Sequence, residues 1–168
     1  MKKVFLLQLL IFISVGIFSQ NASVFQKNGR YCLKDGNNKT IVKPEYDRIF
    51  LFVDECFLTF RDGKVGLVTD KGRTVAEPVF DKIDGFEEGC YKVTQNGKCG
   101  LIGRSGKTLL PMEYENLNKL TNYLYIVDKG EKKGLITKFG DEIIPVKYEN
   151  IEMFSDVLIL LKDSKSIK

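Results

Sequence analysis

The chain is built on a regular internal repeat, and its 34-residue period constrains the fold more than any other feature. A shift by one period aligns the sequence with itself over four copies without a gap. One column of this alignment is leucine in every copy, and the column before it is glycine in three of them: Leu33, Leu67, Leu101 and Leu135, preceded by Cys32, Gly66, Gly100 and Gly134. A unit of this size cannot bury its apolar residues alone, so we expect successive copies to stack.

Turn-forming residues recur at the same period and predict β-hairpins. Asn28-Gly29, Asp62-Gly63 and Asn96-Gly97 lie between short apolar-rich segments. Such pairs suit type I′ turns, which need a positive φ at both central positions. A second turn follows in each copy, marked by Asn38, Gly72, Gly106 and Gly140. A proline in every copy, with a one-residue slip between copies, argues against a helical repeat of this period: Pro44, Pro78, Pro111 and Pro145.

These signals predict an all-β fold built from tandem 34-residue repeats of antiparallel β-hairpins or meanders, stacked into an open array. Each copy is expected to contain three strands, two turns and a corner that includes the proline. Propeller-like and solenoid-like stacking both remain open. The copies fall at about residues 24–57, 58–91, 92–125 and 126–163 of a β-repeat domain spanning 21–168, which ends in a truncated C-terminal strand.

Two further expectations follow from antiparallel pairing. Cys56 and Cys90 share one column, and strands of successive copies that do not stack directly leave these two cysteines without a disulfide. The last strand, from Val157 to Leu161, is expected to present an exposed edge.

The N-terminal segment, 1–20, has the layout of a secretory signal peptide. Lys2 and Lys3 precede a largely apolar run from Val4 to Phe18, and the sequence turns polar at Ser19. The run is short for a membrane span, so we expect cleavage after Ser19 or Gln20 and no stable span in the mature chain; the alternative is an uncleaved N-terminal anchor. The predicted location is extracytoplasmic: periplasm, cell surface or medium.

Composition excludes several chemistries. The chain has no histidine, which removes Ser-His-Asp and Cys-His catalysis and zinc sites that need histidine. Its four cysteines lack metal-ligand spacing. The formal charge of +4 falls to +2 without Lys2 and Lys3, and no basic stripe is interleaved with aromatic residues, so we expect no nucleic-acid partner. No catalytic, cofactor-binding or metal-binding residue is predicted, and no cofactor.

Two charged columns are candidate functional rows. The acidic column follows an aromatic one and could bind cations, but we favour carboxylates that fix the corner after the proline by accepting backbone N–H groups: Asp47, Asp81, Glu115 and Glu149. The basic column could meet an anionic glycan, but we favour solvated charge beside a turn: Arg30, Lys64, Lys98 and Lys132. The aromatic column is interpreted as core: Tyr46, Phe80, Tyr114 and Tyr148.

Taken together, these columns resemble the WG repeat family, also called KWG repeats. In the second copy the matching residues are Val65-Gly66-Leu67-Val68, Asp70-Lys71-Gly72, Pro78 and Phe80-Asp81. The resemblance covers roughly residues 24–163 and implies an extracytoplasmic β-repeat protein without transferable catalytic or binding residues. One departure is clear, since the slot of the family tryptophan holds Tyr31, Val65, Cys99 and Lys133.

The leading expectation is an exported, non-enzymatic repeat protein that serves as a binding or interaction module for another macromolecule, either protein or glycan. The alternative is a structural or assembly component of the cell envelope whose strand edges self-associate. A third reading is a carboxylate-dependent hydrolase using Glu87 and Glu88.

Overall fold

A computed structural model describes residues 22–87, 89–154 and 158–162 of the chain. This part consists of antiparallel strands joined by short turns, and it contains no helix long and apolar enough to cross a membrane. The strands are β1 (Ala22–Lys27), β2 (Arg30–Asp35), β3 (Thr40–Tyr46), β4 (Arg48–Leu51), β5 (Cys56–Arg61), β6 (Lys64–Thr69), β7 (Thr74–Phe80), β8 (Lys82–Glu87), β9 (Cys90–Gln95), β10 (Lys98–Gly103), β11 (Thr108–Tyr114), β12 (Asn116–Lys119), β13 (Leu124–Lys129), β14 (Lys132–Thr137), β15 (Glu142–Tyr148), β16 (Asn150–Phe154) and β17 (Leu158–Lys162).

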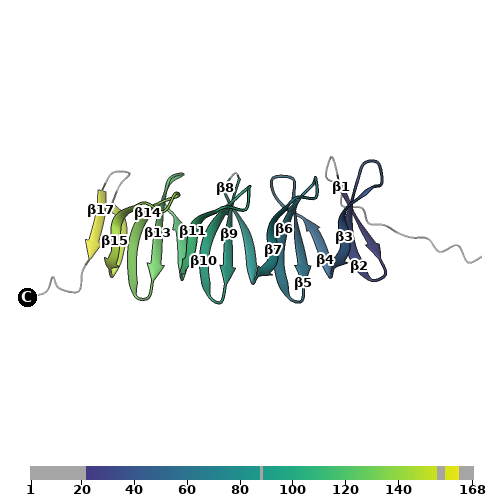
Figure 1. Ribbon diagram of the computed structural model, residues 1–168. Coiled ribbons are helices and arrows are strands. Elements are labelled where there is room, and N and C mark those ends of the chain that lie inside the picture. The colour runs from purple at the N-terminus through teal and green to yellow at the C-terminus, as the bar shows by residue number, and fades with distance from the viewer. Residues whose placement is uncertain (1–21, 88, 155–157, 163–168) are drawn as a thin grey trace, which may run out of the picture.

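The strands form separate meander sheets that follow one another in an open row (Figure 1). The first sheet is β1-β2-β3, and the second, third and fourth are β4-β5-β6-β7, β8-β9-β10-β11 and β12-β13-β14-β15. The pair β16-β17 ends the row. The expected all-β array of antiparallel repeats is therefore confirmed.

Both predicted turns of each copy are present. Asn28 and Gly29 have φ values of 51° and 78°, and the pairs Asp62-Gly63 and Asn96-Gly97 match them closely. Each pair joins two strands in the manner of a type I′ hairpin. At the second turn Asn38 also has a positive φ, of 64°, where the other copies place glycine. Asparagine tolerates this left-handed conformation better than other non-glycine residues, which explains the substitution.

The expectation of three strands per copy was wrong, because each complete sheet has four. The additional strand directly follows the acidic column, as β4 follows Asp47 and β8 follows Asp81. It pairs with the first hairpin of the next copy, so a sheet joins the end of one predicted copy to the start of the next. Strands as short as β4 and β12 show too few alternations to stand out in the sequence.

The proline lies inside the last strand of each sheet, in a bulge, and not in a corner. Cys99 pairs with Tyr114 and Leu101 pairs with Leu110, so three residues of β11 lie opposite Gly100. A Cβ on Gly100 would lie 2.5 Å from the carbonyl oxygen of Leu110. Proline fits such a bulge because it has no N–H to donate to the ladder. The proline occupies either the first or the second of these three positions, which accounts for its one-residue shift between copies.

The core lies between successive sheets. In the contact between the third and fourth sheets, Leu101 and Leu110 pack with Tyr125 and Val127. The leucine column is almost inaccessible to solvent in all four copies. Of the aromatic column, Tyr46 and Tyr114 are buried and Phe80 packs against a core, as expected, whereas Tyr148 is only half-buried. The slot of the family tryptophan also faces these cores, since Val65 and Cys99 belong to them.

The cysteines are buried and none of the four forms a disulfide, so Cys56 and Cys90 are unbridged. The Cys56 thiol instead lies 3.3 Å from the hydroxyl of Tyr91 in the next sheet. Burial raises the pKa of Cys32, Cys56 and Cys99, which keeps these thiols protonated and unreactive at neutral pH.

The predicted last strand, from Val157 to Leu161, corresponds to β17 (Leu158–Lys162). Strand β17 pairs only with β16 among the described residues, so its other edge has no partner there. Val157 lies outside the described residues, as does the whole of the predicted signal peptide, residues 1–20.

Candidate functional site

The two charged columns singled out in the sequence pair with each other. Lys64 forms an ion pair with Asp81 at 2.5 Å. The other three copies repeat this pairing between a residue just after the first turn and the acid of the same copy: Arg30 with Asp47, Lys98 with Glu115 and Lys132 with Glu149. All of these pairs lie at the edge of the array formed by the hairpin turns 28–29, 62–63, 96–97 and 130–131, which we call the first-turn edge.

The acids also connect one sheet to the next. The second carboxylate oxygen of Asp81 accepts a hydrogen bond of 2.7 Å from the backbone N–H of Asn96, in the next hairpin turn. Asp47 and Glu115 accept the corresponding bonds from Asp62 and Gly130. The bonds from Lys64 and Asn96 hold the pKa of Asp81 below its usual range. Three of the four carboxylates thus accept backbone N–H groups, as favoured, but the donors lie in the next hairpin turn and not at the expected corner after the proline.

This arrangement compensates the charges along the first-turn edge. Every member of the basic column there has a carboxylate partner, so a ligand anion would have to compete with that partner. Exposed ion pairs of this kind contribute little to stability on their own. Their main effect is to keep the turns of successive sheets in line.

The opposite ends of the sheets carry the second turns, residues 36–39, 70–73, 104–107 and 138–141, which we call the second-turn edge (Figure 1). The second and third of these turns contact the preceding sheet. A Cβ on Gly72 would lie 2.5 Å from the carbonyl oxygen of Ile41, and one on Gly106 would lie 2.3 Å from that of Val75. Only glycine permits this close approach, and the turns of successive sheets therefore follow one another at regular intervals along the edge.

Neighbouring loops hold these turns in place. The backbone N–H groups of Asp70, Arg104 and Lys138 donate to the carbonyl oxygens of Glu55, Gly89 and Tyr123, which connect the first two strands of the same sheets. The Arg73 guanidinium donates to the carbonyl oxygen of Arg104 in the next turn, at 2.9 Å. The cations on these turns are therefore attached to backbone that neighbouring loops hold in place.

A second basic column, which the sequence analysis missed, lies on this edge. Lys39, Arg73 and Lys107 recur at the period of the repeat, all three are exposed, and none has a carboxylate within 4.0 Å in the described part of the chain. Lys71 and Lys138 likewise have no carboxylate partner in that part. Self-alignment could have found this column, but only strand pairing distinguishes it from the compensated one.

The acids near this edge mostly have other partners. Asp35 accepts the backbone N–H groups of Asn37 and Lys39. Asp54 binds Arg104 at 3.1 Å and the N–H of Gly89 at 3.0 Å. Asp141 accepts the hydroxyl of Thr137. Glu55 is exposed, and the hydrogen bonds to Asp35 and Asp141 come from neutral donors, which leave these carboxylates charged. This edge is therefore distinguished by a row of cations without ion pairs in the described chain, and not by its net charge.

The last of these turns also carries exposed aromatic rings. The side chains of Tyr123 and Phe139 are 64% and 67% exposed, more than any other large hydrophobic residue in the described chain. The Lys138 ammonium lies 4.8 Å from the ring centre of Tyr123 and 5.3 Å from that of Phe139. Neither ring was predicted from the sequence, although each is the only aromatic residue in its repeat column.

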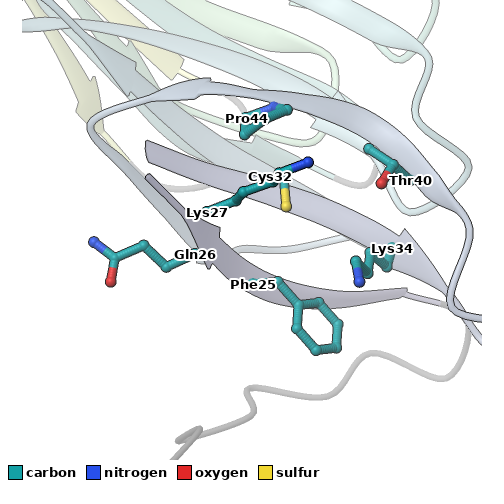
Figure 2. A pocket seen from close by; sticks show the side chains of 7 residues that line it. All are labelled: Phe25, Gln26, Lys27, Cys32, Lys34, Thr40 and Pro44. Carbon is teal, nitrogen blue, oxygen red and sulfur yellow. The ribbon is translucent and has the colours of Figure 1, made fainter. Parts of the chain in front are cut away.

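A pocket of about 260 Å³ lies on the outer face of the first sheet (Figure 2). This face carries Ser23 and Lys34 where later sheets bury residues such as Tyr91 and Ile102. The ammonium of Lys34 lies over the ring of Phe25, at 4.8 Å. Repeat arrays need terminal units with a polar outer face, and the first sheet fits that role.

Neither described pocket carries a catalytic arrangement. The pocket on the first sheet contains Cys32, Lys27 and Lys34 without a carboxylate. A second pocket of about 270 Å³ has no titratable group in its lining: Phe80, Val93, Ile102, Thr108, Leu110, Pro111 and Met112. Within the described residues no three His, Cys, Asp or Glu side chains gather as a metal site. The side chain of Glu87 and all of Glu88 lie outside the described part.

Comparison with known proteins identifies the repeat. A family model described as a WG containing repeat matches residues 33–64, 66–99 and 134–158, which together make up more than half of the chain. These spans include Leu33, Leu67 and Leu135 of the leucine column and three of the four prolines, whereas Leu101 and Pro111 of the third copy lie outside them. No curated protein and no solved structure matches the chain.

Proposed function

The chain belongs to the family of WG-containing repeat proteins, and we propose that it is an exported, non-enzymatic binding protein that holds an extended acidic macromolecule along its second-turn edge. The observation that carries this proposal is the row of Lys39, Arg73 and Lys107 without carboxylate partners in the described chain. The other basic column, on the opposite edge, is compensated by acids.

The spacing of the row favours an extended ligand over a compact one. Each cation comes from a different sheet, and packed sheets lie about 10 Å apart. A small anion could therefore contact one member at a time, whereas a chain with repeated negative charges could contact several. Individual contacts between exposed charges are weak, but contacts made by one polymer act together.

The first prediction tests the row with matched variants. Replacing Lys39, Arg73 and Lys107 by glutamine should weaken binding to polyglutamate and to polygalacturonate about tenfold in low salt. This corresponds to roughly 0.5 kcal/mol for each of three exposed contacts. Isothermal titration calorimetry at several salt concentrations measures both the affinity and its salt dependence, which should become shallower in the variant.

The control is the triple variant Arg30→Gln, Lys64→Gln and Lys98→Gln. It removes the same residue types and the same net charge from the compensated column, so its affinity should stay within about twofold to threefold of the wild type. Circular dichroism melts establish that both variants are folded. Equal losses in the two variants would mean that only net charge matters, and the row would have no special role.

Export is the second part of the proposal. It is supported by Lys2 and Lys3 followed by the apolar run to Phe18, with the first described strand beginning only at Ala22. Cleavage after Ser19 or Gln20 would therefore leave every described strand intact. Mass spectrometry of protein purified from its natural source should find Gln20 or Asn21 at the N-terminus. Soluble mature protein that still begins at Met1 would exclude export by this signal.

A further inference from the structure

We propose that Tyr123, Lys138 and Phe139 form a platform for a sugar ring, and that the acidic macromolecule on the second-turn edge is a polysaccharide that contains uronate. This inference rests on the proposed function, because the platform extends the same row of cations. It adds the chemical class of the ligand, which charge alone does not define.

The two rings stand out because they break the repeat. The column of Tyr123 holds Glu55 and Gly89 in earlier copies, and that of Phe139 holds Asn37, Lys71 and Ser105. A side chain needed to build the repeat recurs in every copy and has a structural partner, as the buried leucine column and the paired acidic column show. Two large rings that occur once and stay exposed do not serve the fold. They are candidates for contact with a ligand.

The backbone holds both rings in place. The N–H of Lys138 donates to the carbonyl oxygen of Tyr123, which ties the two loops together at 2.9 Å. The N–H of Tyr123 donates to the hydroxyl of Thr121, and that of Phe139 donates to the hydroxyl of Thr137. The Lys138 ammonium, which lies near both ring centres, is therefore carried on loops that hydrogen bonds hold in place. An arrangement that is already ordered loses less entropy when it binds.

The chemistry of this cluster suits an acidic sugar. The apolar C–H face of a pyranose packs against an aromatic face, and the Tyr123 hydroxyl can exchange hydrogen bonds with sugar hydroxyls. The Lys138 ammonium, which has no carboxylate partner in the described residues, can bind the carboxylate of a uronate. Near the two rings in sequence, Asn122 and Glu142 are exposed and can exchange hydrogen bonds with sugar hydroxyls, while Ile143 adds exposed apolar surface.

The platform continues the row. A Cβ on Gly140 would lie 3.6 Å from Cδ1 of Leu110 and 3.7 Å from the carbonyl oxygen of Leu109, so the last turn lies against β11, the strand that follows the third turn. The fourth turn has Asp141 in the column of Lys39, Arg73 and Lys107, and its cation is Lys138 instead. A polysaccharide lying along the edge would thus meet cations on the first three turns and a ring platform on the fourth.

The test compares two carboxylate polymers that differ in having sugar rings. The double variant Tyr123→Ala and Phe139→Ala should bind polygalacturonate at least tenfold more weakly than the wild type. Its affinity for polyglutamate should change by less than twofold, because the cations are untouched. Phe25→Ala is the matched control, since it also removes an exposed ring beside a lysine, but on the first sheet. This control should leave both affinities unchanged.

The outcomes separate this inference from the proposed function. If the wild type binds polyglutamate but not polygalacturonate, or if the double variant keeps its affinity for polygalacturonate, the platform is excluded and the cation row stands. Equal weakening toward both polymers would indicate an acidic polypeptide as ligand and would also exclude the platform. Failure to bind either polymer would overturn both proposals. A melting temperature close to that of the wild type shows that the variants are folded.

Discussion

Gly100→Ala is expected to lower the free energy of unfolding by about 3 kcal/mol, the upper end of the cost of overpacking. The added Cβ would lie 2.5 Å from the carbonyl oxygen of Leu110 and 2.9 Å from two further backbone atoms of β11. Backbone atoms cannot rotate away as a flexible side chain can. For a chain of this length the melting temperature should fall by about 6–12 °C, and urea denaturation measures the energy directly.

The matched control is Gly36→Ala. A Cβ on Gly36 meets no atom within 4 Å, and its φ is outside the positive region. This variant should be neutral, or more stable by up to about 1 kcal/mol, because alanine restricts the unfolded chain. Equal stability of the two variants would show that the bulge in β11 yields to the side chain.

The first sheet shows why one copy can have a residue other than glycine in the slot of Gly100. Cys32 occupies this slot there, and it lines the pocket on the outer face of the sheet (Figure 2). No described sheet covers that face, so the bulge around Pro44 has space to move outward. The third sheet packs against neighbours on both faces, and Gly100 has no such space.

Leu101→Ala should cost about 2–5 kcal/mol, since this side chain is 0% exposed between the third and fourth sheets. Its neighbours Leu110, Tyr125 and Val127 belong to two different sheets, so the cavity left by the truncation cannot close through movement of one strand. The midpoint of urea denaturation should fall while its slope stays constant.

Met112→Ala is the control for Leu101→Ala. Met112 lies on β11 of the same sheet but is 37% exposed, so the loss should be within about 1 kcal/mol. A loss below about 0.5 kcal/mol for Leu101→Ala would mean that the leucine column does not carry the core, against its burial in every copy.

The repeat itself helps to separate structure from function in this protein. Residues that recur in every copy have structural partners, as the ion pairs and turn bonds of Asp47, Asp81 and Glu115 show. The candidate binding residues either lack carboxylate partners in the described chain, as Lys39 and Lys107 do, or occur in one copy only. The residues most informative about function in such an array are therefore those that depart from the repeat and those charged residues that have no ion-pair partner.

Much of the fold could be predicted from the sequence because its signals are local. The pair Asp62-Gly63 predicts a type I′ turn by its own conformational preference, whatever surrounds it. The invariant slot of Leu33, Leu67, Leu101 and Leu135 predicts a core because burial must recur with the period. These properties depend on residue type and spacing, which the sequence contains in full.

Only the tertiary structure determined which charged residues form ion pairs. The columns that contain Lys64 and Arg73 look similar in the sequence, since the first holds a cation in all four copies and the second in three. Antiparallel pairing brings Lys64 beside Asp81 at the first-turn edge and leaves Arg73 on the opposite edge without a carboxylate partner in the described chain. Which charges meet depends on which strand ends share an edge, and that follows from pairing between residues distant in sequence. The short strand after each acid, missed in the sequence, completes this geometry.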